Sequence, residues 1–125
     1  MSVGLVANET LVIGTGIKQG WLQAYDLDTF TQTAKSSLPL PEAVTCMCQG
    51  EDSSTIMVGM NDSKIACIRA GRGFLEVLGS FPLGTAVKTF HTISRTSRGD
   101  YLIGTMSGIC FVKWLSIEKK FEIIR

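Results

Sequence analysis

Short runs of β-branched and aromatic residues, broken by glycine-rich and polar turns, extend along the whole chain. Runs of this kind are typical of β-strands, because branched and aromatic side chains pack well on a pleated sheet. No stretch of about ten or more residues has the 3.6-residue period of apolar side chains that an amphipathic helix needs. The pattern therefore predicts an all-β protein.

Three apolar segments share one pattern, and each contains a glycine at the same place. Gly14, Gly59 and Gly104 follow one another at intervals of 45 residues. A fixed period of about 20 to 50 residues is the signature of a repeat protein. We therefore expect the 125 residues to form one domain of three units, at about 1–42, 43–85 and 86–125.

Each unit contains four strand-like segments separated by turn residues. In the second unit the breaks are Gly50–Ser54, Asn61–Ser63 and Gly71–Gly73, compositions that favour tight turns. Consecutive strands joined by such turns pair in antiparallel fashion. The predicted strands are Val3–Ala7, Leu11–Gly16, Trp21–Leu27 and Phe30–Ser37, then Val44–Gln49, Thr55–Met60, Lys64–Ala70 and Gly73–Phe81, then Val87–Arg95, Tyr101–Met106, Ile109–Leu115 and Lys119–Ile124.

Four antiparallel strands per 45 residues resemble one blade of a β-propeller of the WD40 type, whose blades span about 40 to 45 residues. The segment Gly59–Ile65 is similar to the Gly-x-x-Asp-Gly-x-Ile turn of that family, and Ala24–Leu27 stands where its Trp-Asp pair would be. The sequence has no Gly-His dipeptide, and Cys67–Arg69 and Phe111–Lys113 replace the Trp-Asp ending in the other units. The resemblance implies three degenerate WD40-like blades.

Three blades are too few to close a propeller, which needs about four to eight. The apolar blade faces at the two ends of the array would stay open, and exposed apolar patches of that size normally mark an interface. Three arrangements satisfy this requirement. The chain is a half propeller that forms a six-bladed homodimer around a two-fold axis, it completes a propeller of another chain, or it is a segment of a larger signalling or regulatory protein.

The composition is typical of a protein that buries part of its surface against a partner. Apolar residues make up 45% of the chain and charged residues 18%, below the average of about 25%. The formal net charge of +1 gives no field that would attract nucleic acid or an acidic membrane. The apolar runs are far shorter than a bilayer span, and the first residues lack the features of a signal peptide. We expect a cytoplasmic or nuclear protein without nucleic-acid or membrane partners.

Candidate catalytic and metal-binding groups are few. Cys46, Cys48, Cys67 and Cys110 lie in apolar surroundings, where free cysteine behaves as a small buried hydrophobe. The single histidine, His91, lies in an alternating strand with no recognisable nucleophile or carboxylate partner. We therefore predict no enzyme activity, no metal and no cofactor.

The resemblance implies a non-catalytic scaffold for protein-protein interactions. Two alternatives stay open: an enzyme or small-molecule binder that uses the central channel after dimer closure, and a β-sandwich in which the three repeat glycines would be paired unequally. For partner contact we select aromatic residues suited to a propeller rim and a small basic loop. These residues are Trp21, Tyr25, Arg95, Arg98 and Trp114.

Overall fold

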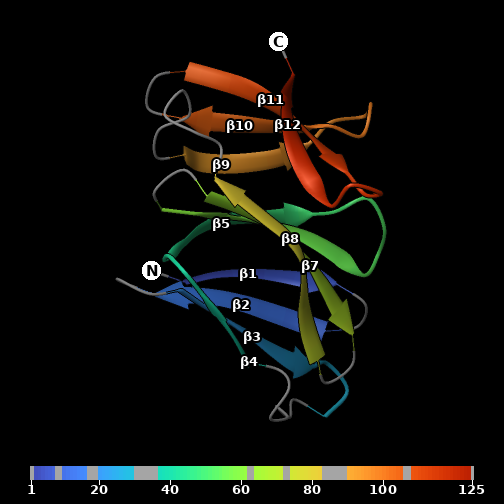
Figure 1. The fold of residues 1–125 in the computed structure, drawn as a ribbon. Helices are drawn as coiled ribbons and strands as arrows, with labels where there is room; N and C mark the ends of the chain where they lie inside the picture. Colours follow the sequence, from blue (N-terminus) through green and yellow to red (C-terminus); the bar gives the residue numbers. More distant parts are fainter. Residues whose placement is uncertain are drawn as a thin grey trace.

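The computed structural model of this chain describes residues 2–7, 10–16, 20–29, 37–61, 64–71, 74–82, 90–105 and 108–124. In this part of the chain all regular structure is β: twelve strands form three four-stranded antiparallel sheets. Within each sheet, strands adjacent in sequence are adjacent in space. Figure 1 shows the sheets stacked in chain order, with the second sheet between the first and the third. The prediction of an all-β chain with three antiparallel blades is confirmed.

The strands are short, and most turns between them are tight. The first sheet contains β1 (Ser2–Ala7), β2 (Thr10–Gly16), β3 (Gly20–Asp26) and β4 (Ser37–Leu40). The second contains β5 (Val44–Gln49), β6 (Thr55–Met60), β7 (Lys64–Gly71) and β8 (Phe74–Pro82). The third contains β9 (Phe90–Arg95), β10 (Tyr101–Thr105), β11 (Gly108–Leu115) and β12 (Lys120–Ile124).

The last strand of the first sheet differs from its prediction. The sequence pattern favours Phe30–Ser37, whereas β4 begins at Ser37 and ends at Leu40. Residues 30–36 lie outside the described part of the chain. The apolar side chain of Leu40 is buried in the core between the first two sheets, so packing rather than local strand propensity sets this position. Pro39 is tolerated there because β4 is an edge strand.

The second sheet is buried on both faces, and β6 shows this most clearly. All six residues of β6 are buried. Because side chains alternate between the two faces of a strand, Ile56 and Val58 point toward the first sheet and Met57 points toward the third. The middle sheet therefore contributes to two separate cores, one at each junction between sheets.

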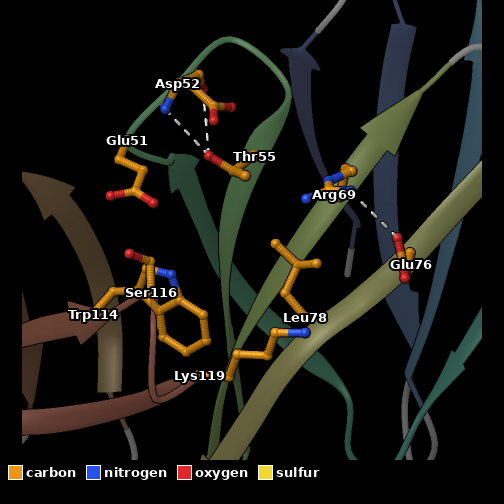
Figure 2. A pocket seen from close by; sticks show the side chains of 9 residues that line it. All are labelled: Glu51, Asp52, Thr55, Arg69, Glu76, Leu78, Trp114, Ser116 and Lys119. Carbon is orange, nitrogen blue, oxygen red and sulfur yellow. Dashed lines mark hydrogen bonds and ion pairs between the residues drawn. The ribbon is translucent and has the colours of Figure 1, made fainter.

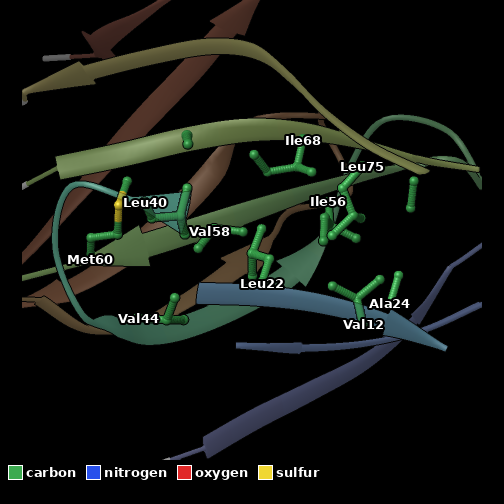
Figure 3. Packing of buried hydrophobic residues seen from close by; sticks show 12 residues of the cluster. Val12, Leu22, Ala24, Leu40, Val44, Ile56, Val58, Met60, Ile68 and Leu75 are labelled. Carbon is green, nitrogen blue, oxygen red and sulfur yellow. The ribbon is translucent and has the colours of Figure 1, made fainter. Parts of the chain in front are cut away.

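The core between the first and second sheets is made of aliphatic side chains from both (Figure 3). Leu22 and Val12 of the first sheet pack with the face of β6 that carries Ile56 and Val58. Complete burial of such side chains stabilises the fold by about 1.5 to 3 kcal/mol each. The cluster consists of Val12, Leu22, Ala24, Leu40, Val44, Ile56, Val58, Met60, Ala66, Ile68, Ala70 and Leu75.

The core between the second and third sheets contains more aromatic and sulfur-bearing residues. The indole of Trp114 lies against the ring of Phe121, with 4.7 Å between ring centroids. Tyr101 is fully buried in the same cluster. Its members are Cys46, Met57, Ile65, Cys67, Ile93, Tyr101, Ile103, Val112, Trp114 and Phe121.

The three repeat glycines occupy equivalent places in their sheets. Each lies in the second strand and pairs with the third strand at a matching position. The partners are Leu22 for Gly14, Ile65 for Gly59 and Ile109 for Gly104. This equal pairing, in three separate sheets, contradicts the β-sandwich alternative.

Gly14 has the close approach that the repeat predicts. A Cβ atom on Gly14 would lie 2.7 Å from Cγ1 of Val44 and 3.1 Å from Sδ of Met47, both in the next sheet. By contrast, a Cβ on Gly104 would meet Thr92 of its own sheet first, at 2.6 Å. This difference arises because strand alternation turns Gly104 away from the second sheet, toward the side where the described chain has no following sheet.

Candidate interaction surfaces

One strand position shows how the third sheet differs from the other two. The residue paired with the repeat glycine is Leu22 in β3, Ile65 in β7 and Ile109 in β11. Leu22 and Ile65 are each 0% exposed because the following sheet covers them. Ile109 is 70% exposed at the same position. A large apolar side chain thus lies in solvent where the repeat normally buries one.

Ile109 belongs to a larger apolar surface, the third-sheet end face, formed by Leu102, Ile109 and Phe111. Leu102 pairs directly with Phe111, so both side chains lie on the same side of the sheet. The guanidinium of Arg98 lies 5.6 Å from the centre of the Phe111 ring, a distance that allows a cation-π contact. This face points away from the second sheet.

The opposite end of the array carries the first-sheet end face, formed by Leu11, Ile13, Trp21 and Tyr25. Leu11 pairs directly with Tyr25. Trp21 is 41% exposed. Leu11 and Ile13 stand three residues and one residue before the repeat glycine, as Ile56 and Val58 do in the fully buried β6. Both end faces therefore correspond to surfaces that are buried inside the stack.

The residues selected from the sequence for partner contact do not form a single site. Trp21 and Tyr25 share the first-sheet end face, and the exposed Arg95 ends β9. Trp114 lies in the core between the second and third sheets and is only 8% exposed. Their role in binding a partner stays a prediction.

The basic loop after β9 is held together by its own contacts. The hydroxyl of Thr96 donates a hydrogen bond to the carboxylate of Asp100. Arg98 forms an ion pair with the same carboxylate at 3.3 Å. The Arg98 side chain therefore bridges Asp100 and Phe111, at the border of the third-sheet end face.

A pocket of about 190 Å³ lies where the second and third sheets meet (Figure 2). Strand ends and turns of both sheets supply its walls, and Trp114 and Leu78 supply its apolar part. The remaining lining residues are polar or charged: Glu51, Asp52, Thr55, Arg69, Glu76, Ser116 and Lys119. Sequence reasoning missed this pocket apart from Trp114, because its residues come from segments up to 68 positions apart (51 to 119).

The four cysteines are free thiols. Cys46 and Cys67 are buried and the other two are half-buried, as their apolar surroundings predict. Burial raises the pKa of Cys48 and the pKa of Cys67 to about 12, so both thiols are protonated at neutral pH. These groups behave as apolar core residues rather than as nucleophiles.

Among the described residues no three His, Cys, Asp or Glu side chains are grouped so that they could hold a metal ion. That part of the chain also contains no helix of the length and apolar character needed to cross a bilayer. His91 is placed in β9, but its side chain lies outside the described part of the structure.

Comparison with known proteins places this fold among β-propellers. A chain of the mitotic checkpoint complex is similar with a TM-score of 0.63 and 14% identity, over 93% of this chain and 33% of that one. The β-propeller domain of Myceliophteria thermophila Cps50 (Swd1) matches with a TM-score of 0.56 and 10% identity, over 94% and 54%. The Dos1 propeller gives 0.56 and 10%, over 99% and 35%. No family model and no curated protein matches the sequence.

These likenesses establish the fold. The three sheets have the fold of β-propeller blades, as the repeat predicts. The chain spans a third to about half the length of the propeller chains that it matches, so it forms part of a propeller.

Proposed function

We propose that this protein is a non-catalytic interaction module that binds proteins through the two end faces of its blade array. The observation that carries the proposal is the exposure of Ile109 at a position that is fully buried in both preceding blades. Exposed apolar side chains that continue a repeat core are suited to bind another blade rather than a small polar ligand. The four free thiols agree with a location in the cytoplasm, where thiols stay reduced.

The partner that fits both end faces is a second copy of the chain. Inside the array, the face that carries Leu22 in one blade packs against the face that carries Ile56 in the next. The third-sheet end face corresponds to the face that carries Leu22, and the first-sheet end face corresponds to the face that carries Ile56. The two end faces are therefore complementary. Two copies related by a two-fold axis would make this junction twice and give a closed ring of six blades.

Light scattering coupled to size exclusion tests this arrangement over a dilution series. The wild type is expected at twice the single-chain mass of 13.6 kDa. Ile109→Glu and Ile13→Glu each place a charge in both junctions, so each variant alone should have the mass of one chain. Ile117→Glu is the matched control, because Ile117 is 92% exposed in the turn after β11, and it should leave the mass unchanged.

Mixing the two end-face variants distinguishes the head-to-tail ring from other dimers. Ile109→Glu keeps an intact first-sheet end face and Ile13→Glu keeps an intact third-sheet end face. The mixture can therefore form one intact junction and should regain part of the double mass. A dimer in which the third-sheet end faces pack on each other would resist Ile13→Glu and show no such recovery. A wild type with single-chain mass at every concentration would exclude the second copy as partner, and propeller blades from another polypeptide would then be the occupants to test.

A further inference from the structure

Two local irregularities of the backbone lie at the pocket between the second and third blades. The β7–β8 register shifts between Cys67 and Ile68, which pair with Gly79 and Val77, so Leu78 is the extra residue of a β-bulge. Bulges redirect a side chain, and Leu78 lines the pocket. Lys119, also in the lining, has a φ of 55°, a left-handed conformation that is uncommon for a residue with a side chain.

The indole of Trp114 is fixed where it borders this pocket. A Cβ atom on Gly79 would lie 2.6 Å from Cη2 of Trp114, so the indole fits only because residue 79 has no side chain. Phe121 packs against the same indole from within the core. Together with Leu78, the indole gives the pocket a rigid apolar wall.

The charged side chains around this wall differ in whether they already form a hydrogen bond or an ion pair. The Asp52 carboxylate accepts hydrogen bonds from the amide and the hydroxyl of Ser54, at 2.9 and 2.8 Å. Arg69 and Glu76 form an ion pair at 3.8 Å. Within the described part of the chain Glu51 forms no ion pair of this kind, and Figure 2 shows its carboxylate directed toward the space beside Trp114 and Ser116.

We propose that this pocket binds a basic side chain of a protein partner, with arginine preferred over lysine. An indole beside a carboxylate that forms no ion pair is a combination that holds a guanidinium, which packs against the exposed part of the indole and donates paired hydrogen bonds to the carboxylate. The cation would lie between Trp114 and Glu51. Lys119 lines the same pocket, and its ammonium opposes the entry of a second cation.

This inference rests on the proposed role in protein binding but not on ring formation, because the pocket lies within one chain. It predicts opposite effects at two lining residues. Removing the charge of Glu51 should weaken the binding of a cation, and removing the charge of Lys119 should strengthen it. An anionic guest would reverse both signs.

Trp114 itself can report binding. The chain has two tryptophans, so Trp21→Phe leaves Trp114 as the sole indole fluorophore. In this background we would titrate the blocked tripeptide acetyl-Gly-Arg-Gly-amide, with the Lys and Glu tripeptides as comparisons, and follow both fluorescence and the indole N–H signal by NMR. A saturable change is expected for the Arg peptide with a Kd on the order of 1 to 10 mM, which suits one stacked and ion-paired side chain.

Variants that each remove one charge, inside or outside the pocket, test whether the pocket binds a cation. Glu51→Gln should raise the Kd for the Arg peptide about fivefold or more, and Lys119→Gln should lower it about twofold or more. Glu122→Gln, which removes an exposed carboxylate of β12 outside the pocket, should leave it unchanged. Stronger binding of the Glu peptide, with reversed effects of the two variants, or the absence of any saturable change would overturn the proposal.

A further comparison separates this inference from the ring. The Ile109→Glu variant should still bind the Arg peptide with unchanged Kd, whatever its mass. If the peptide binds and the wild type has single-chain mass at every concentration, the pocket assignment holds and the second-copy ring fails. If the wild type forms the ring but the peptide does not bind, the second-copy ring holds and the pocket assignment fails.

Discussion

The repeat glycines show how much of this fold depends on a single missing side chain. At Gly14 the following blade approaches so closely that Val44 lies within 2.7 Å of an added Cβ. At Gly4, in contrast, an added Cβ would meet Leu11 and Val12 at 3.9 Å, which is ordinary van der Waals contact. The two glycines lie in the same sheet. The approach of the next blade therefore decides which of them can be replaced.

Gly14→Val is expected to lower the free energy of unfolding by about 1 to 3 kcal/mol, the usual range for overpacking a closed core. Urea unfolding followed by circular dichroism measures the change. Gly4→Ala is the control and should change the free energy of unfolding by less than about 0.5 kcal/mol. Equal effects of the two substitutions would show that blade approach does not explain the glycine repeat.

The thiols of Cys48 and Cys67 provide a prediction for alkaline pH. Burial raises the pKa of each from 9.0 to about 12 in the folded protein. Above pH 9 the unfolded chain loses these protons while the folded chain keeps them, so the free energy of unfolding should fall as pH rises from about 9 to about 12. Denaturant unfolding at pH 8 and pH 10.5 measures this fall.

A Cys67→Ala variant should show a smaller fall over the same pH interval, because it lacks one of the groups whose pKa burial raises. At pH 8, a thiol-specific reagent should modify all four cysteines at once only in denaturant. Rapid modification of all four in the folded protein would contradict the protonated, buried state of these thiols.

Strands of the same sequence type have different surroundings in the three blades. β6 is buried along its whole length because it lies between two neighbouring sheets. β7 is also buried along most of its length, yet Ile109 near the beginning of β11 is exposed where Ile65 of β7 is fully buried. Apolar side chains on the outer faces of the end blades are therefore of the same type as core side chains, although the described part of the chain does not cover them.

Ile65→Ala and Ile109→Ala compare one substitution at equivalent positions. Ile65→Ala should lower the free energy of unfolding by about 2 to 5 kcal/mol, because it opens a cavity in a closed core. Ile109→Ala should change it by less than about 0.5 kcal/mol when measured by urea unfolding at a concentration where the protein has single-chain mass. A large loss for Ile109→Ala under that condition would mean that another part of the chain covers this residue.

The molecule as a whole is a one-dimensional array in which blades pack against their neighbours in sequence (Figure 1). Stability in such an array is approximately the sum of blade terms and junction terms. Two junctions, one aliphatic and one rich in aromatic and sulfur-bearing side chains, supply the cores described above. The six-bladed ring proposed here would add two further junctions, which is the physical advantage of association.

The prediction of β6 shows why much of this fold could be derived from local information. Thr55–Met60 carries a run of strand formers bounded by turn residues, and the observed strand has the predicted bounds. The position of β4 shows the opposite case. Its four residues are a strand because Leu40 reaches the core beside the second blade, and no local preference of Ser37–Leu40 indicates this.

The same distinction applies to the candidate sites. Trp114 stands out in the sequence as an aromatic residue, but only packing shows that its indole is held by Phe121 and Gly79 and borders a pocket with Glu51. The sequence predicts open apolar faces at the two ends of the array, but only the structure shows that Ile109 is exposed there, since an apolar residue in a strand normally predicts burial.

Strand type, the 45-residue period and the number of blades follow from the order of residues, because turn chemistry and side-chain alternation act over a few positions. Burial, the pocket between the second and third blades and the open end faces depend on contacts between residues far apart in the chain. Those contacts exist only once the blades have stacked, so the tertiary structure alone determines which apolar residues form a core and which remain available to a partner.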